Sequence, residues 1–152
     1  MPGPLAITLL PADDHNGRMA AATLLETAFA DGGRYARSRI LTQLSPEVPP
    51  FYRHAFIARR EGDIVGVGCL KAADWASDTH ILHLSAVTEA ARGQGIARAL
   101  VCARIAWVRE HFDCGRLLVS TAHTRRFVRL GFRSVGTHAA GERRLMMMEF
   151  SR

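Results

Sequence analysis

The chain has 152 residues, 48% of them hydrophobic and 22% charged, which is ordinary for one globular domain that buries a core without disulfides or metals. No apolar stretch approaches the roughly 18–20 residues that a bilayer-spanning helix needs, so we expect no membrane insertion. The net charge is +6, and Lys71 is the only lysine. Because the arginines are scattered and lack interleaved aromatic residues, the charge favours a solvated surface first, an anionic ligand second and nucleic acid last.

The N-terminal segment, residues 1–10, has no basic start, and Pro11 and the acidic residues after it interrupt its short apolar stretch. We interpret it as a strand of the mature protein instead of a signal peptide, and we expect a cytoplasmic protein. The cysteines are odd in number and form no Cys-x-x-Cys pair, which predicts reduced and mostly structural thiols at Cys69, Cys102 and Cys114.

In chain order the pattern predicts a strand, two helices, three strands, a helix, a strand, a short helix and two strands. Their approximate ranges are 5–10, 19–29, 35–44, 55–58, 64–70, 81–87, 95–111, 116–120, 124–130, 132–135 and 144–150. Asp13 or Asp14 can cap the first helix. The segment 81–87 is apolar on both faces, which is typical of a central strand. The order predicts a mixed α/β architecture with a helical crossover after that strand.

Spacing within the long helix predicts which of its faces is buried. The apolar side chains recur at intervals of four, three and four residues, at Ile96, Leu100, Ala103 and Trp107. We expect these four residues to form the buried stripe of the helix.

The central strand runs into a glycine-rich turn, Arg92-Gly93-Gln94-Gly95-Ile96-Ala97, that opens the long helix. Such a turn is suited to an anion, because the first turn of a helix has free N–H groups and the positive end of the helix dipole. Gly93 and Gly95 let phosphate oxygens approach the backbone, and Arg92 can add a charge-assisted hydrogen bond.

Two common phosphate-binding loops do not match this turn. A nucleoside-triphosphate loop needs Lys and then Ser or Thr after the glycines, and here Ala97 and Arg98 follow. A dinucleotide fingerprint needs a third glycine where Arg98 stands. The acid about twenty residues further on, Asp113, precedes a strand instead of ending one.

A third comparison fits better, because Arg92-x-x-Gly95-x-Ala97 resembles the diagnostic pattern of the GNAT superfamily of N-acetyltransferases. The hairpin over 56–68 resembles a strand pair of the family, and Phe127-Val-Arg-Leu-Gly-Phe132 resembles its motif of Phe-Tyr, two residues and Leu-Gly-Phe. The resemblance covers about residues 5–150. It implies a single domain over residues 1–152, with a mostly antiparallel, twisted mixed sheet, splayed central strands and helices on both faces.

The resemblance also implies an acyl-coenzyme A site. In the family, backbone amides of the turn hold the pyrophosphate of the coenzyme, and the splayed central strand binds the pantetheine arm. This places pantetheine at Ala86 and Val87, and the pyrophosphate at Arg92, Gly93, Gln94, Gly95, Ile96 and Ala97. Acetyl-CoA would act as a cosubstrate, and the reaction needs no metal.

The chain departs from the family at two positions. Val128 stands where the family often has a tyrosine that protonates the leaving thiolate, and Thr121 stands where an asparagine is common. Thr121 can offer its hydroxyl to the ligand or cap the short helix. Arg125 and Arg126 open that helix, and they either reach the phosphates of the coenzyme or are solvated.

Catalytic candidates follow from the need for a proton acceptor with a pKa near neutrality. His83 suits this without perturbation, and it shares a face of the central strand with Ser85. The alternative for His83 is a core histidine with a hydrogen-bond partner. His123 is either an acid or proton relay or a plain loop residue, and Tyr35 or Tyr52 can replace the missing tyrosine.

The resulting hypothesis is an enzyme that transfers an acetyl group from acetyl-CoA directly to a primary amine of a small molecule or a peptide. The alternative is a non-catalytic acyl-CoA-binding or regulatory module, which Val128 motivates, and a nucleic-acid binder comes third. The acceptor is set by the loops around 30–54, 71–80 and 136–143. Their acids allow a cationic acceptor without requiring one, and by analogy with the family a homodimer is an open possibility.

Overall fold

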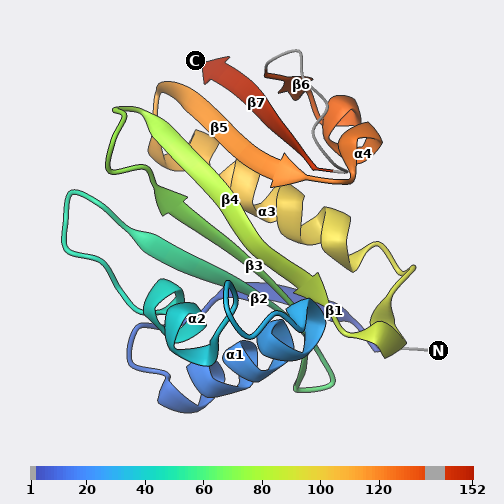
Figure 1. The fold of residues 1–152 in the computed structure, drawn as a ribbon. Coiled ribbons are helices and arrows are strands. Elements are labelled where there is room, and N and C mark those ends of the chain that lie inside the picture. Colours follow the sequence, from blue (N-terminus) through green and yellow to red (C-terminus); the bar gives the residue numbers. More distant parts are fainter. Residues whose placement is uncertain (1–2, 136–142) are drawn as a thin grey trace.

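The structure is a computed structural model that describes residues 3–135 and 143–152 (Figure 1). Its centre is a seven-stranded sheet in the order β1-β2-β3-β4-β5-β7-β6. The strands are β1 (Leu5–Leu9), β2 (Arg53–Arg60), β3 (Asp63–Ala72), β4 (Thr79–Val87), β5 (Cys114–Thr121), β6 (Arg133–Ser134) and β7 (Arg144–Ser151). The helices are α1 (His15–Phe29), α2 (Arg37–Leu44), α3 (Ile96–His111), α4 (Thr124–Arg129) and the 3₁₀ turn η1 (Glu89–Ala91).

All neighbouring strands are antiparallel except β4 and β5, which run parallel. A parallel pair needs a long crossover connection, and α3 supplies it. The result is the mixed, mostly antiparallel sheet that the sequence predicts, and the order of elements agrees with the prediction.

Helices cover both faces of this sheet (Figure 1). On one face α1 and α2 pack against β2 and β3, where Leu25, Ile40 and Val67 belong to one buried apolar cluster. On the other face α3 and α4 pack on the sheet around a second cluster that includes Leu100, Leu117 and Phe127. The molecule therefore has two apolar layers separated by the sheet, and the glycine turn lies at the start of α3.

Local capping explains where the helices begin. The carboxylate of Asp14 accepts a hydrogen bond of 2.8 Å from the backbone N–H of Gly17 and caps α1, as predicted. Gly95 precedes α3 with a φ of 80°, a backbone conformation that favours glycine. The second helix is shorter than predicted and begins at Arg37.

The predicted buried stripe of α3 is wrong in its second half. Ile96 and Leu100 are buried, but the buried face then continues through Val101, Arg104 and Val108, while Ala103 and Trp107 are half-buried. The prediction from the spacing of apolar residues failed here because an arginine occupies a core position of the helix. The Arg104 side chain is 1% exposed, and its Nη1 donates to the carbonyl of Cys69 at 2.9 Å.

The cysteine prediction needs a similar correction. Cys69 is buried, but Cys102 and Cys114 are exposed thiols, so only one of the three contributes to the core. Gly141, in the predicted final loop, lies outside the described residues. Within the described residues, no helix combines the length and the apolar character that crossing a membrane requires.

Candidate functional site

The sheet opens between β4 and β5, because these two strands pair over only part of their length. The two strands pair from Thr79 and Arg116 as far as Leu82 and Val119, and the rest of β5 pairs only with β7. A cavity of about 1150 Å³ occupies this opening. Residues from both helical layers line it, including Phe29 and Ile40 on one face of the sheet and Leu100 and Phe127 on the other. The cavity therefore connects the two faces through the gap between β4 and β5.

A β-bulge in β4 shapes the cavity wall. His83 is paired with Cys69 and Ala86 with Val67, so three steps along β4 match two steps along β3. The extra residue is accommodated at Leu84, whose φ is +48°. As a result Leu82 packs in the cluster under α3, whereas Leu84 packs in the cluster under α1 and α2.

The bulge overturns one expectation about the catalytic candidates. Residues two apart share a face only in a regular strand. Because Leu84 changes the alternation, His83 lies on the α1 and α2 face with Cys69, and Ser85 lies on the opposite face. Both residues line the cavity, but they do not share a face as the sequence predicts.

The glycine turn borders the cavity at the start of α3. Gly93 has a φ of 78° and Gly95 a φ of 80°, and a Cβ at either position would meet no heavy atom within 4 Å. Glycine is therefore required by the backbone conformation, and the space next to it is open. The N–H groups of the first turn of α3 lack helical acceptors and border this space. The cavity-lining residues of this region are Arg92, Gly93, Gly95, Ile96, Ala97 and Arg98.

The side chains of two predicted coenzyme-binding residues do not line the cavity, and for Gln94 the expected contact is through the backbone amide, which stays a prediction. The Gln94 side chain accepts a hydrogen bond from Arg60 and does not line the cavity. The Arg125 side chain is exposed outside the cavity, and Arg126, the next residue of α4, lines it instead. Helical geometry points neighbouring side chains in different directions, so the sequence alone does not distinguish the two arginines.

The ends of β4 and β5 form another part of the cavity wall. Ala86, Val87 and Thr121 line it, as the resemblance implies for coenzyme contacts. The Thr121 hydroxyl is buried and accepts a hydrogen bond of 2.9 Å from the N–H of His123. Since α4 begins at Thr124 with His123 as its N-terminal cap residue, this bond orders the approach to the helix without capping it.

His83 occupies an unusual position for a base. Its side chain is half-buried, and its Nε2 atom is fully buried with no hydrogen-bond partner among the described residues. Burial lowers the pKa of His83 to about 3, and the positive charges of Lys71 and Arg104 act in the same direction. His83 is thus neutral at neutral pH and a weaker base than the unperturbed imidazole that the sequence suggests.

The remaining candidates for the general acid, and the valine at the usual tyrosine position, differ in their surroundings. His123 is exposed at the edge of the cavity. Val128 is 58% exposed and lies outside the cavity lining. Tyr35 lines the cavity and stacks on Phe29 with ring centroids 4.3 Å apart. Tyr52 lies outside the main cavity, and its hydroxyl shares a hydrogen bond of 2.6 Å with His80 Nδ1.

Comparison with known proteins decides the family. The model of the acetyltransferase (GNAT) family matches residues 40–132, which include β2, β3, most of the cavity lining and the glycine turn. The chain belongs to the GNAT acetyltransferase family. The family is the one that the Arg92–Ala97 turn indicates, and membership confirms that interpretation of the sequence.

Solved GNAT-type structures share the fold. An acyl-CoA N-acyltransferase from Pseudomonas aeruginosa superposes with a TM-score of 0.74 at 17% identity, covering 95% of this chain and 99% of that one. The ribosomal-protein-S18-alanine N-acetyltransferase from Escherichia coli gives 0.75 at 15% identity, with 98% and 96% covered. PaiA N-acetyltransferase from Thermoplasma acidophilum, solved in complex with coenzyme A, gives 0.68 at 11% identity, with 97% and 99% covered. A comparison with curated protein sequences gave no match.

The GNAT chain has no metal-binding cluster in the part that the structure describes, since no three His, Cys, Asp or Glu side chains there are placed to hold an ion. Its candidate site is a cavity through the sheet, with the glycine turn at one end and His83, whose pKa burial lowers, in its wall.

Proposed function

We propose that this GNAT protein transfers an acetyl group from acetyl-CoA directly to the primary amine of a small molecule or a peptide. The observation that carries the proposal is the Arg92–Ala97 turn, which begins α3 beside a cavity that passes between β4 and β5. A donor held at the turn can extend along β4, and an acceptor can approach from the face that α1 and α2 cover. Both substrates then meet inside the sheet.

The donor site is built mainly from backbone groups. The amides at Gly93, Gly95, Ile96 and Ala97 would receive the pyrophosphate, helped by the dipole of α3 and the charge of Arg92. Beyond the bulge, the edge of β4 next to β5 has no strand partner among residues 3–135 and 143–152, so Ala86 and Val87 can bind the pantetheine amides. Thr121 and Arg126 border the same space, and Arg126 suits a phosphate contact better than Arg125 does.

The transfer requires few protein groups. The neutral amine attacks the thioester carbonyl carbon, a C–N bond forms, the C–S bond breaks, and the sulfur leaves as a thiolate. The amine nitrogen loses one proton and the thiolate gains one, which gives an amide and free coenzyme A. His83 Nε2 can hold the amine by a hydrogen bond, while its low pKa favours water as the proton carrier, with Ser85 or His123 as a relay toward solvent.

The alternative function is an acyl-CoA-binding module without turnover. It is favoured by one observation, namely that Val128 replaces the expected tyrosine and lies at the surface. Release of thiol from acetyl-CoA, measured with a panel of amines, distinguishes the two functions. Thiol release that depends on the amine supports the transferase. Tight coenzyme binding without release for any amine supports the module, and absence of acetyl-CoA binding in calorimetry contradicts both.

A further inference from the structure

The half of the cavity beneath α1 and α2 is cationic. Arg34, Arg39 and Lys71 line it, and none of the described residues that line the cavity is an aspartate or a glutamate. This composition is unexpected for a site that would receive a positively charged amine, because like charges repel in a half-buried site.

The charges of this half are not neutralised by the protein, although nearby cations are. Arg37, on the same helix as Arg39, forms an ion pair of 3.0 Å with Glu26, and Arg53 forms one of 2.8 Å with Glu47. Arg34, Arg39 and Lys71 have no carboxylate within 4.0 Å among residues 3–135 and 143–152. Within this half of the cavity, Arg34, Arg39 and Lys71 are thus the cations left available to a ligand.

Lys71 is the most enclosed of these cations. Its Nζ donates a hydrogen bond of 3.1 Å to the side-chain oxygen of Gln43, which also lines the cavity. Burial lowers the pKa of Lys71, the charge of Arg53 lowers it further, and Asp74 in an adjoining hollow opposes them. A bound anion would offset the desolvation of the Lys71 ammonium group and its repulsion by Arg53.

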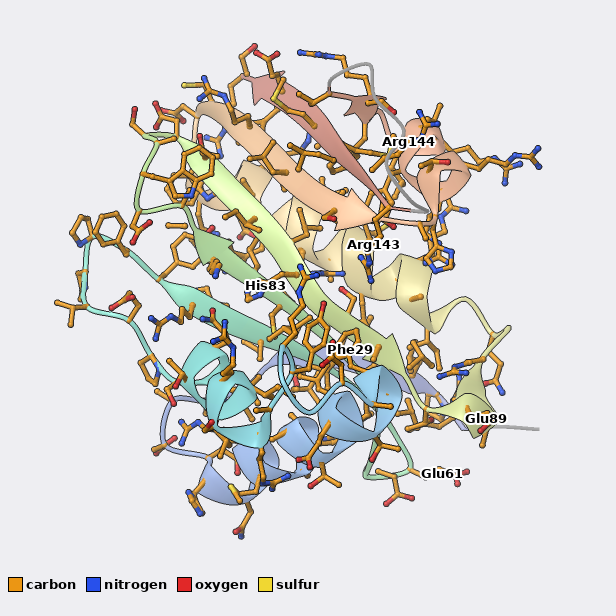
Figure 2. The ribbon with its side chains drawn as sticks, viewed as in Figure 1. Phe29, Glu61, His83, Glu89, Arg143 and Arg144 are labelled. Carbon is orange, nitrogen blue, oxygen red and sulfur yellow. The ribbon has the colours of Figure 1, made fainter. Side chains whose placement is uncertain are left out.

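His83 supplies an independent sign of a missing ligand at the same place. Its buried Nε2 has no hydrogen-bond partner in the described part of the chain, and leaving such an atom unpaired costs free energy. Lys71 is paired with Ile81 and Cys69 with His83, so Lys71 and His83 are diagonal neighbours on one face of the sheet and can meet one ligand. Figure 2 shows His83 near the centre of the sheet, whereas the labelled acids Glu61 and Glu89 lie toward the end where the glycine turn begins.

The phosphates of acetyl-CoA do not account for the anion that Arg34, Arg39 and Lys71 would bind. Lys71 is paired with Ile81, and the turn follows Val87 at the other end of β4. Six residues of strand at about 3.3 Å each separate the two ends by roughly 20 Å. The cavity therefore has a cationic region at each end, and each region can bind a separate anionic group.

We propose that the acceptor is a primary amine that also carries an anionic group, a carboxylate or a phosphate, bound by Lys71 with Arg39 and Arg34. The amine then lies at His83. This inference rests on the proposed function and names its acceptor class. Nearby positive charge lowers the pKa of the acceptor ammonium and so favours the neutral, nucleophilic amine. The cationic acceptor that the loop composition allows is disfavoured for the same reason.

The first test compares acceptors that differ only in the anion. One arm uses amino acids, their carboxamides and the corresponding decarboxylated amines, and a second arm uses phosphoethanolamine against ethanolamine. With acetyl-CoA saturating, we expect kcat/KM for the anionic member of at least one arm to exceed that of its neutral partner by about tenfold or more, as charge-assisted hydrogen bonds allow. The arm that shows the preference identifies carboxylate or phosphate.

The second test removes the cations one at a time. Lys71→Gln and Arg39→Gln should raise KM for the anionic acceptor about tenfold, change KM for its partner without the anion much less, and leave acetyl-CoA affinity unchanged. Arg37→Gln is the matched control, because Arg37 is on the same helix but is paired with Glu26 and does not line the cavity. A change in the control equal to that in Arg39→Gln would overturn the assignment.

The outcomes separate this inference from the proposed function. Thiol release at equal rates with charged and neutral partners overturns the inference and leaves the transferase intact. If no amine releases thiol, the transferase proposal fails, and calorimetry of the same pairs with the protein saturated with coenzyme A then decides the inference. Preferential binding of the anionic member supports it, and equal binding or no binding overturns it.

Discussion

The guanidinium of Arg104 lies directly against Gly68, so that a Cβ built at Gly68 would be 2.8 Å from Arg104 Cζ. The arginine is buried between α3 and β3, and its Nη1 donates to the carbonyl of Cys69. Burial lowers the pKa of Arg104 to about 10. Gly68 thus provides the space that lets an arginine occupy a core position of α3, next to the strand that carries Cys69 opposite His83.

Gly68→Ala should therefore destabilise the protein by about 1–3 kcal/mol, since an added methyl group overfills a packed site. Denaturant unfolding measures the change. In an Arg104→Met background the guanidinium is absent, and Gly68→Ala should lower the free energy of unfolding by clearly less. An equal cost in both backgrounds would show that the collision with Arg104 is not the cause.

Gly95→Glu should abolish measurable acetyl-CoA binding, because the side chain places bulk and negative charge at the start of α3, where the pyrophosphate is proposed to bind. Gly62→Glu is a matched control. Gly62 also has a positive φ, of 85°, and open space around its Cα, but it lies in the turn between β2 and β3. Both substitutions should lower the free energy of unfolding to a similar extent, by about 1–2 kcal/mol. Calorimetry with acetyl-CoA that gives the same affinity for the two variants would contradict a donor site at this turn.

His83→Ala should lower kcat by at least about tenfold and leave acetyl-CoA affinity nearly unchanged, because His83 lies on the acceptor side of the bulge. His83→Gln retains a hydrogen-bonding side chain and should recover part of the loss. Steady-state kinetics and thermal unfolding are measured together. Equal losses of turnover and affinity with a lower Tm would mean that His83 is structural.

Stability should fall as the solution becomes acidic. Burial lowers the pKa of His54, His80 and His83 from the ordinary value of 6.5, for His83 to about 3. A lowered folded-state pKa means that the stabilisation is fully present above pH 6.5 and is lost as the pH falls below it, by up to about 1.4 kcal/mol per pH unit for the well-buried His83 and by less for His54 and His80, whose charges solvent partly screens. Denaturant unfolding at pH 8, 6 and 5 tests this. In His83→Leu the decline should be shallower, and an identical slope would show that His83 does not contribute.

Much of the fold was predictable because local signals agreed with one another. Asp14 as a cap, the hairpin between β2 and β3, and the long helix after the glycine turn each follow from short-range backbone chemistry. The bulge at Leu84 was not predictable, because it depends on the register between β3 and β4 and places His83 and Ser85 on opposite faces. The choice of Arg126 over Arg125 at the cavity likewise depends on how α4 packs.

By itself, the sequence determined the family and the place of the glycine turn proposed to bind the donor, since a strand, Gly93, Gly95 and a helix are consecutive in the chain and their backbone chemistry is local. Only the tertiary structure decided the character of the proposed acceptor side. Arg39, Lys71 and His83 come from α2, β3 and β4, and whether a charge is paired or left facing a cavity depends on which carboxylates the fold brings near it. Ion pairing and desolvation act through space, so the order of residues along the chain does not reveal them.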